Sequence, residues 1–248
     1  MTAVTPRLRL FAGPNGSGKS VLKSCLPPPL LGVYLNPDEL EADIRRTGFL
    51  DLRGLGVETT RETVLPFFTE SVFLNAEGLH HQSRHLRFAG GRLDFTGMEM
   101  NAYFASVAVD FLRRQLLARR VSFTFESVMS HPGKVRLLED ARSAGYRTYL
   151  YFVATDDPEI NVSRVRNRVA LGGHAVPEDK IVSRYHRSLS LLMEAIRHSS
   201  RAYIFDNSTD NADGQHTWLA EITEGKILEL KADRVPAWFN KAVLNRIS

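Results

Sequence analysis

The chain has 248 residues, of which 43% are hydrophobic and 24% charged, so it is long and apolar enough to bury one sizeable core. A single cysteine, Cys25, excludes an internal disulfide and agrees with a reducing cytoplasm. The sequence has no run of eighteen apolar residues and no apolar N-terminal stretch, which excludes a membrane-spanning helix and predicts a cytoplasmic protein. The formal net charge of +4 is a mild excess that does not require a nucleic-acid partner.

The first predicted element is a buried strand over 8–12, and the segment GPNGSGKS follows it. This segment matches the phosphate-binding loop pattern G-x-x-x-x-G-K-[ST], and a short helix is expected directly after it. Backbone N–H groups of such a loop bind phosphate, while Lys19 would reach the β- and γ-phosphates and the Ser20 hydroxyl would bind Mg²⁺. The predicted nucleotide-binding residues here are Gly13, Pro14, Asn15, Gly16, Ser17, Gly18, Lys19 and Ser20.

A second strand is predicted over 31–35, and Asn36-Pro37-Asp38 follows it as the start of a helix. Asp38 could accept the proton of a substrate hydroxyl and direct its oxygen at the γ-phosphate of a nucleotide. A carboxylate in the first turn of a helix can equally do no more than stabilise that helix through its dipole. The pattern alone leaves both interpretations open.

Residues 47–98 contain many glycines and a basic stretch that begins at position 80. We interpret this segment as an inserted, partly helical subdomain on the acceptor side. A clearer helix follows over 99–120, because apolar residues recur there at helical spacing. Its basic end is interpreted as a solvated helix terminus rather than a nucleic-acid patch, and it contains Arg113, Arg114, Arg119 and Arg120.

Residues 121–125 predict another buried strand, which Glu126 closes. A carboxylate at this place usually serves the Mg²⁺ shell or positions substrate in P-loop proteins, and no aspartate closes a hydrophobic strand in the Walker-B manner. The alternative is that Glu126 caps a helix or a turn.

Two basic helices, at 158–171 and 178–196, follow a helix at 132–144 and a strand at 146–154. The Gly-rich break at 172–177 separates them, which predicts a lid over 164–188 that closes over nucleotide. Phosphoryl transfer needs positive charge over the γ-phosphate, so we expect two of the lid arginines to be catalytic and the others to lie at the surface. The candidates are Arg164, Arg166, Arg168, Arg184 and Arg187, with His174 as a further candidate lid contact.

A last core strand is predicted over 201–205, and residues 226–230 predict an edge strand. Asn207 follows the core strand and could border an adenine, although an Asx turn explains the segment equally well. The alternation of strands with helices predicts an α/β fold of the P-loop NTPase type, with a mainly parallel sheet flanked by helices, as a single domain over 1–248. Four candidate residues follow strands and are expected at one edge of the sheet, namely Gly13, Asp38, Glu126 and Asp206.

These motifs together resemble the zeta-toxin-like P-loop kinases. The motifs that carry the resemblance are GPNGSGKS at 13–20, NPD at 36–38, FTFES at 123–127, GGHAVP at 172–177 and RYHRS at 184–188. They occur in this order and span about residues 8–208. Their combination is much more specific than the phosphate-binding loop alone.

The resemblance implies a kinase that depends on ATP and Mg²⁺. Zeta toxins phosphorylate a hydroxyl of UDP-N-acetylglucosamine, and a small antitoxin usually restrains them. By the same resemblance Lys19 and Ser20 hold phosphate and metal, Asp38 is the base, and Glu126 is a metal or substrate carboxylate. The better-known toxins have an arginine just before a T-P in the lid. Here the chain reads HAVP, so the lid role would fall to Arg184 or Arg187, with Arg168 or Arg164 as the helix arginine.

Two other functions remain open. UDP-N-acetylglucosamine is the leading acceptor by resemblance only, so the chain could be a P-loop kinase of another metabolite, such as a nucleotide or a nicotinamide cofactor. It could also be a nucleotide-binding regulatory ATPase whose basic runs at 80–87 and 113–120 bind nucleic acid. Steep salt dependence of nucleic-acid binding would support this last function.

Overall fold

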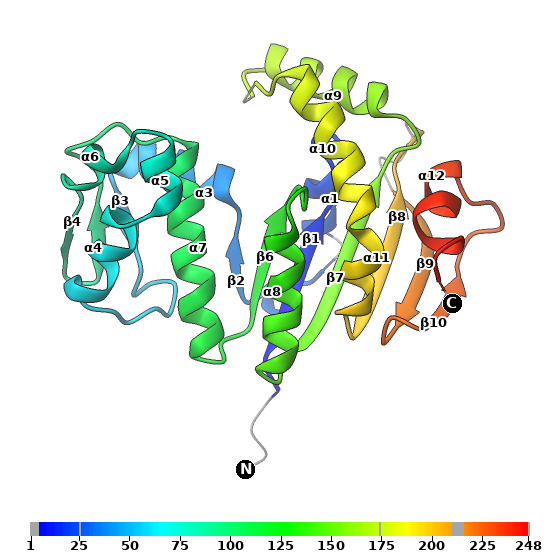
Figure 1. Ribbon diagram of the computed structural model, residues 1–248, viewed down its shortest axis with the longest axis horizontal. Helices are drawn as coiled ribbons and strands as arrows, with labels where there is room; N and C mark the ends of the chain where they lie inside the picture. The colour runs from blue at the N-terminus through cyan, green and yellow to red at the C-terminus, as the bar shows by residue number, and fades with distance from the viewer. Residues whose placement is uncertain (1–4, 25, 174, 210–215, 248) are drawn as a thin grey trace. The chain divides into compact units, whose positions relative to one another are not determined.

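A computed structural model describes residues 5–24, 26–173, 175–209 and 216–247 of the chain. The expectations for Cys25 and His174 therefore concern residues outside the described ranges. The large sheet is built from β1 (Arg7–Ala12), β2 (Val33–Leu35), β6 (Phe123–Ser127), β7 (Arg147–Ala154), β8 (Arg201–Asp206), β9 (Thr217–Thr223) and β10 (Ile227–Leu230). Within the described residues these seven strands have the order β10-β9-β8-β7-β1-β6-β2 (Figure 1).

The centre of this sheet is parallel, because β7 pairs in parallel with β1 on one side and with β8 on the other. At one edge β9 and β10 pair antiparallel to their neighbours. The predicted α/β fold with a mainly parallel sheet is therefore confirmed, and so is the edge strand expected at 226–230. Strand β9 was not expected from the sequence.

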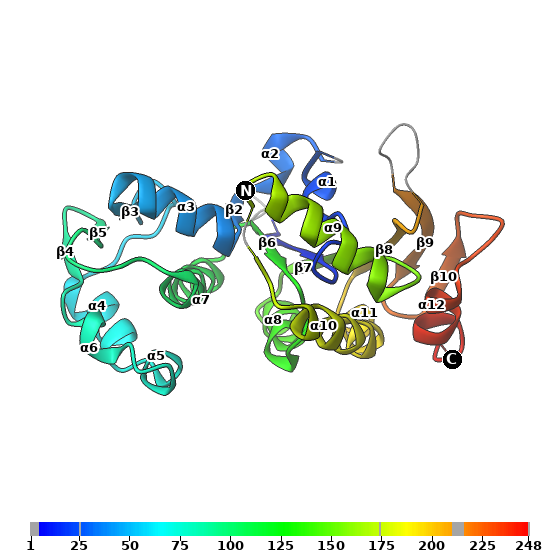
Figure 2. The same ribbon diagram turned by 90° about the horizontal axis from the view of Figure 1, so that it is seen from above.

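Helices cover both faces of the sheet, so most residues of its central strands are buried on either side. Helices α8 (Pro132–Ser143) and α11 (Leu192–Arg197) cover one face, and α1 (Lys19–Ser24) covers the other (Figure 2). Leu8, Leu10 and Phe11 of β1 are all fully buried between these layers. Burial on both faces places β1 rigidly at the centre of the fold, directly before the predicted phosphate-binding loop.

The chain divides into two compact units, residues 1–31 with 124–248 and residues 32–123. Within the first unit, α2 (Pro28–Leu31) begins at a proline, and α9 (Pro158–Ala170) and α10 (Glu178–Ser190) form the predicted lid region. The strand expected from Leu31 starts only at Val33, because Leu31 is the last residue of α2. Prolines are well tolerated in the first turn of a helix, which is where Pro28 lies. The helix expected over 178–196 is two helices, α10 and α11, which meet at Leu191.

The second unit combines helices with a small sheet. Its helices are α3 (Pro37–Thr47), α4 (Arg61–Thr69), α5 (Val72–Ala76), α6 (His80–Ser83) and α7 (Ala102–Ala118). Its antiparallel sheet has the order β3-β5-β4 and consists of β3 (Phe49–Asp51), β4 (Arg87–Ala89) and β5 (Arg92–Asp94). The sequence did not predict this sheet, because strands of three residues are too short to show an alternating pattern.

Helix α7 begins three residues later than its apolar spacing predicted. The Asn101 side chain accepts hydrogen bonds from the Tyr103 and Phe104 N–H groups, which makes it the N-cap. Two arginines at the basic end of this helix form ion pairs within the helix, since both Arg113 and Arg114 pair with Asp110. Pairs of this kind are those of a surface helix, in line with the interpretation of the run as a helix terminus.

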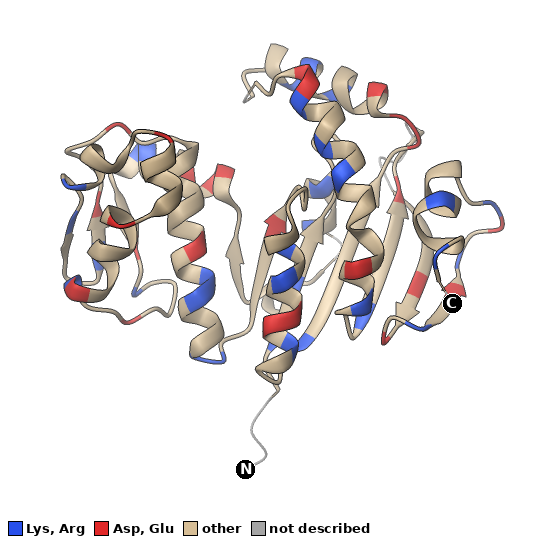
Figure 3. Cartoon of the chain, viewed as in Figure 1, with Lys and Arg blue, Asp and Glu red and all other residues tan. Residues whose placement is uncertain are grey.

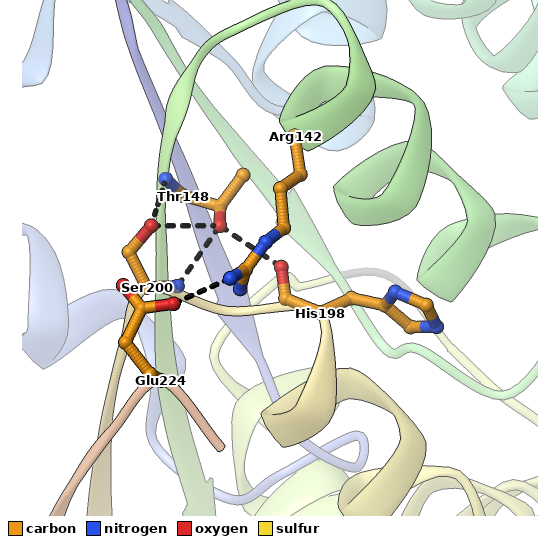
Figure 4. A network of polar contacts seen from close by, with 5 residues as sticks. All are labelled: Arg142, Thr148, His198, Ser200 and Glu224. Atoms are coloured by element: carbon orange, nitrogen blue, oxygen red, sulfur yellow. Dashed lines mark hydrogen bonds and ion pairs between the residues drawn. The ribbon is translucent and has the colours of Figure 1, made fainter.

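A polar network joins the starting ends of β7 and β8, at the edge of the sheet opposite the phosphate-binding loop (Figure 4). The Thr148 hydroxyl donates to the His198 carbonyl oxygen at 2.9 Å and accepts from the Ser200 N–H at 3.0 Å. Arg142 forms an ion pair with Glu224 in the same network. These contacts fix the register of β7 and β8 at their starting ends. The register in turn fixes the positions of their carboxyl ends, where the predicted site lies.

Candidate active site

The segment 13–20 forms the connection between β1 and α1, as expected for a phosphate-binding loop. Gly13 has φ of 148°, and a Cβ atom there would lie 2.1 Å from the Val153 carbonyl oxygen. A Cβ atom on Gly18, whose φ is 95°, would lie 2.5 Å from the Asn207 side-chain nitrogen. Both positions therefore require glycine, because the loop packs closely against β7 and the segment after β8.

Lys19 at the start of α1 turns back over the loop. Its Nζ atom donates to the Gly13 and Pro14 carbonyl oxygens, each at 2.9 Å. A charged phosphate oxygen is a stronger acceptor for an ammonium group than a backbone carbonyl. The side chain is thus held at the loop in a position from which it can exchange carbonyl partners for phosphate.

A buried asparagine from α9 supports one end of the loop. Asn161 has no exposed surface, and its Nδ2 atom donates to the Asn15 carbonyl oxygen at 2.5 Å. Its Oδ1 atom accepts a hydrogen bond from the Thr155 hydroxyl, and the Tyr185 hydroxyl donates to the Thr155 carbonyl oxygen at 2.7 Å. Burial, followed by nearby carboxylates, raises the pKa of Tyr185, so its hydroxyl remains a donor. This chain connects α10 to the loop through α9.

A second asparagine supports the other end of the loop. Asn207 donates from Nδ2 to the Ser17 carbonyl oxygen at 2.9 Å and from its backbone N–H to the Ala154 carbonyl oxygen at 2.8 Å. Its own carbonyl oxygen accepts a hydrogen bond from Arg164 at 2.7 Å. The fold therefore brings together three parts of the predicted site, namely the loop, Asn207 and Arg164.

His216 lies against the same loop and was missed by the sequence analysis. A Cβ atom on Gly18 would be 2.8 Å from its Nε2 atom. Both ring nitrogens are buried and find no hydrogen-bond partner among the described residues, and the same holds for the Ser17 hydroxyl. Burial, reinforced by the Arg164 charge, lowers the pKa of His216 against the opposing effect of Asp206. Neutral, unpartnered polar groups beside a phosphate-binding loop can take a ligand as their partner.

Helices α9 and α10, which are predicted to form the lid, are packed together by Val162, Val165 and Ile181. Arg166 forms an exposed ion pair with Glu178 of α10 at 2.5 Å, so it links the two helices to each other. The Arg168 carbonyl oxygen accepts a hydrogen bond from the Gly173 N–H at 2.9 Å.

Helix α10 has an acidic first turn, and basic residues are coloured blue along the rest of it in Figure 3. Of the two arginines predicted there, Arg184 is half-buried and Arg187 is exposed. Of the arginines predicted for the lid, Arg164 donates a hydrogen bond to Asn207 beside the loop. Which of the others contact a nucleotide stays a prediction.

The two predicted carboxylates lie on different elements. Glu126 is half-buried on β6, and the cap of the following helix α8 is His131, whose Nδ1 atom accepts from the Gly133 N–H at 3.1 Å. Glu126 is therefore not the cap of that helix. Asp38 belongs to the second unit, where it is exposed in the first turn of α3 and donates its N–H to Asn36 Oδ1 at 2.9 Å. This placement agrees with either interpretation of Asp38.

The supporting residues left only weak signals in the sequence. Asn161 is a polar residue on the apolar face of α9 that includes Val162 and Val165, which is an unusual place for an amide. His216 stands directly before β9, a strand that the sequence analysis did not identify. Recognition of either residue needed the tertiary contacts.

The fold and the loop define a P-loop protein with a mainly parallel α/β sheet. The model of the zeta toxin family matches residues 82–213, which is more than half of the chain. This protein therefore belongs to the zeta toxin family, as its motifs predicted. The matched region includes Glu126, Arg164 and Asn207 and begins after the phosphate-binding loop and Asp38.

Two solved structures are similar in fold. The crystal structure of AvrRxo1-ORF1:AvrRxo1-ORF2 with sulphate ions has a TM-score of 0.53 and 15% identity, over 99% of this chain and 66% of that chain. The structure of AvrRxo1-ORF1:-ORF2 with ATP has a TM-score of 0.50 and 16% identity, over 92% and 61%. At this level of identity the similarity concerns the fold. The chain spans slightly less than two thirds of these structures.

A sequence relative is an uncharacterised protein of Haemophilus influenzae, which is 29% identical over 69 residues. The alignment covers 28% of this chain and 49% of that protein. The chain thus spans about half the length of this relative.

Proposed function

We propose that this chain is an ATP-dependent kinase of the zeta toxin type that transfers the γ-phosphoryl group of ATP to a hydroxyl. The observation that carries the proposal is the loop 13–20, with Lys19 turned over it and Asn161 and Asn207 bonded to its carbonyl oxygens. Membership of the zeta toxin family supports the same activity. ATP is the proposed donor, and the ATP bound in one structure of similar fold supports this choice.

At the loop, the backbone and Lys19 would bind the β- and γ-phosphates, and Arg164 would add positive charge beside Asn207. The Ser20 hydroxyl and the Glu126 carboxylate are hard oxygen donors of the kind that Mg²⁺ prefers. The described residues contain no cluster of three or more His, Cys, Asp or Glu that could hold a metal. This agrees with a nucleotide-bound Mg²⁺, because such an ion takes most of its ligands from phosphate and water. When bound, it would neutralise charge on the phosphates.

In the proposed reaction the acceptor oxygen forms a bond to the γ-phosphorus, the bond to the bridging oxygen of ADP breaks, and Asp38 takes the hydroxyl proton. Exposure of Asp38 in the first turn of α3 leaves its carboxylate accessible to a substrate. Two of the lid arginines would stabilise the transferring group, with Arg168 and Arg184 as first candidates and Arg187 as the alternative.

The proposed acceptor is UDP-N-acetylglucosamine, on the strength of the family. A cavity of about 850 Å³ in the second unit is large enough for a small molecule and includes Asn36, Glu39 and Asp43 beside α3. Polar and charged groups of this kind can bind the hydroxyls of a sugar. The partner proposed for this kinase is an antitoxin protein, and the pairing of two proteins in the similar AvrRxo1 structures supports it.

The test is phosphoryl transfer from ATP with Mg²⁺ to a pool of nucleotide sugars, nucleotides and nicotinamide cofactors, read by mass spectrometry. The Asp38→Asn variant should lose transfer by about 10²- to 10⁴-fold and keep ATP binding, because a general base contributes this much to the rate. Glu41→Gln is the matched control, since Glu41 lies on the same helix, pairs with Arg45 and is outside the lining of the proposed acceptor cavity.

A gain of one phosphate on UDP-N-acetylglucosamine would support both the activity and the acceptor. Phosphate on another member of the pool would keep the kinase and replace the acceptor. Full transfer by Asp38→Asn would show that Asp38 is not the base, and bound ATP without transfer to any member would favour a regulatory ATPase.

A further inference from the structure

The first unit has a second cavity, of about 350 Å³, between α10 and the C-terminal segment. This segment consists of α12 (Ala237–Phe239) and the π-helical turn η1 (Asn240–Leu244), which packs against α11. The described residues that line the cavity include none of residues 13–20. A volume of this size lies within the range of small-molecule sites in proteins.

The floor of this cavity is apolar and aromatic. Tyr185 and Trp238 are 3% and 4% exposed, and their polar atoms are already bonded within the protein. The Tyr185 hydroxyl donates to the Thr155 carbonyl oxygen, and Trp238 Nε1 donates to Asp206 Oδ1 at 2.7 Å. What these two side chains leave uncovered at the cavity is therefore a small area of ring carbon, beside Leu189 in the lining.

The rim of the cavity carries a positive charge. Lys241 and Arg246 are permanent cations on the C-terminal side, and His186 lies on the α10 side. Asp156 is the carboxylate of the rim, and its Oδ1 atom accepts the Trp238 N–H at 3.2 Å. Two cations against one hydrogen-bonded carboxylate favour an anion at the rim, above a floor that favours a flat apolar group.

We propose that this cavity is a binding site for a small anion with an aromatic body, such as an aryl carboxylate, and that its occupancy is coupled to the phosphate-binding loop. The ring would lie in the cavity against Leu189 and the edges of Tyr185 and Trp238, and the anionic group would face Lys241 and Arg246. Such a ligand is chemically distinct from a nucleotide, because the site offers no glycine-rich loop for a chain of phosphates.

Two hydrogen-bond chains connect the cavity to the loop. Tyr185 leads through Thr155 and Asn161 to the Asn15 carbonyl oxygen. On the other side, Trp238 bonds Asp206, and the next residue, Asn207, bonds the Ser17 carbonyl oxygen. A ligand that holds Tyr185 and Trp238 in place therefore stabilises both supports of the loop. Its effect on nucleotide affinity rests on the proposed function, whereas its binding and its effect on the loop do not.

Binding is tested with 2-naphthoate as the probe and its neutral amide, 2-naphthamide, as the matched compound. The chain has two tryptophans, so the indole N–H signals in a ¹H–¹⁵N NMR spectrum are two, and a Trp218→Phe variant assigns that of Trp238. The naphthoate should shift the Trp238 signal in a saturable manner, and the amide should bind more weakly. An unmoved Trp238 signal, or equal affinity for the amide, would overturn the proposal.

The rim charges are tested with the double variant Lys241→Met and Arg246→Met. Both residues are exposed, so the fold should persist, and the naphthoate should bind about fivefold more weakly or worse, as expected for two exposed ion pairs. The control is Lys226→Met with Arg234→Met, which removes the same charge at exposed positions outside the cavity lining. Equal loss of affinity in both double variants would assign the effect to net charge and overturn the site.

Coupling to the loop is tested by hydrogen exchange of a peptide that contains residues 13–20, measured by mass spectrometry without nucleotide. Saturating 2-naphthoate should slow exchange in this peptide, and the loss of this effect in the Lys241→Met and Arg246→Met variant should accompany the loss of binding. Unchanged exchange with the probe bound would overturn the coupling. Because ATP is absent, this outcome is independent of whether the chain is a kinase.

Discussion

The phosphate-binding loop and the start of α3 are stabilised in opposite ways. The loop receives hydrogen bonds from Asn161 and Asn207, which lie 146 and 190 positions from their partners in the chain. At the start of α3 the Asp38 and Glu39 N–H groups donate to the Asn36 side chain, which stands only two and three positions before them. The loop geometry thus depends on the whole first unit, whereas the position of Asp38 on its helix is set locally.

This contrast predicts that substitutions around the loop affect nucleotide binding and stability together, while substitutions at the start of α3 separate the two. Four changes test it, in addition to Asp38→Asn.

The largest effect is expected for Lys19→Ala. Removal of a charge aimed at the transferring phosphoryl group should lower kcat/KM for ATP by at least about 10³-fold. Lys23→Ala is the control, because Lys23 lies in the last turn of the same short helix. Turnover within tenfold of the unchanged protein, measured with the acceptor that the transfer assay identifies, would contradict the role given to Lys19.

Asn161→Ala should weaken the loop and the fold together. The change removes the hydrogen bonds of Asn161 to the Asn15 carbonyl oxygen and to the Thr155 hydroxyl, which should lower the free energy of unfolding by about 1–3 kcal/mol. ATP affinity should fall as well, which calorimetry can measure beside urea denaturation. Asn167→Ala on the exposed side of α9 is the control. A normal ATP affinity in Asn161→Ala would mean that the loop keeps its shape without this support.

Asn36→Ala should have a smaller and purely local effect. Loss of the N-cap of α3 should lower the free energy of unfolding by about 1 kcal/mol. ATP affinity should stay unchanged while kcat falls, because without the cap the first turn of α3 no longer holds Asp38 in one position. A change in ATP affinity as large as that of Asn161→Ala would remove the distinction between the two regions.

The smallest effect is expected for His216→Gln, as a change in pH dependence. The folded protein lowers the pKa of His216 below its ordinary value of 6.5, so the unfolded chain binds more protons as the pH falls below that value. This group therefore costs stability on acidification, and His216→Gln should flatten the decrease of Tm below pH 6.5. An unchanged slope of Tm against pH would show that His216 does not contribute to it.

Part of the site could be predicted from the sequence because the residues of the phosphate-binding loop form one short motif. Residues 13–20 form the loop within one segment, and Leu8, Leu10, Phe11 and Ala12 before them predict a buried strand. Its supports could not be read in the same way, since Asn161 and His216 have no neighbours in sequence that reveal what they contact. The small sheet β3-β5-β4 escaped prediction for a related reason, because its three-residue strands are defined by their pairing partners.

By itself, the sequence determined the family, the α/β fold with its mainly parallel sheet, and the place of the phosphate-binding loop. These follow from local patterns, namely apolar runs, glycine spacing and motif order, that need no knowledge of distant contacts. The tertiary structure decided which residues support the loop and where a second cavity forms beside Tyr185 and Trp238. Such features arise only when segments far apart in the chain bury polar groups against one another, because each buried group must then find its hydrogen-bond partner there.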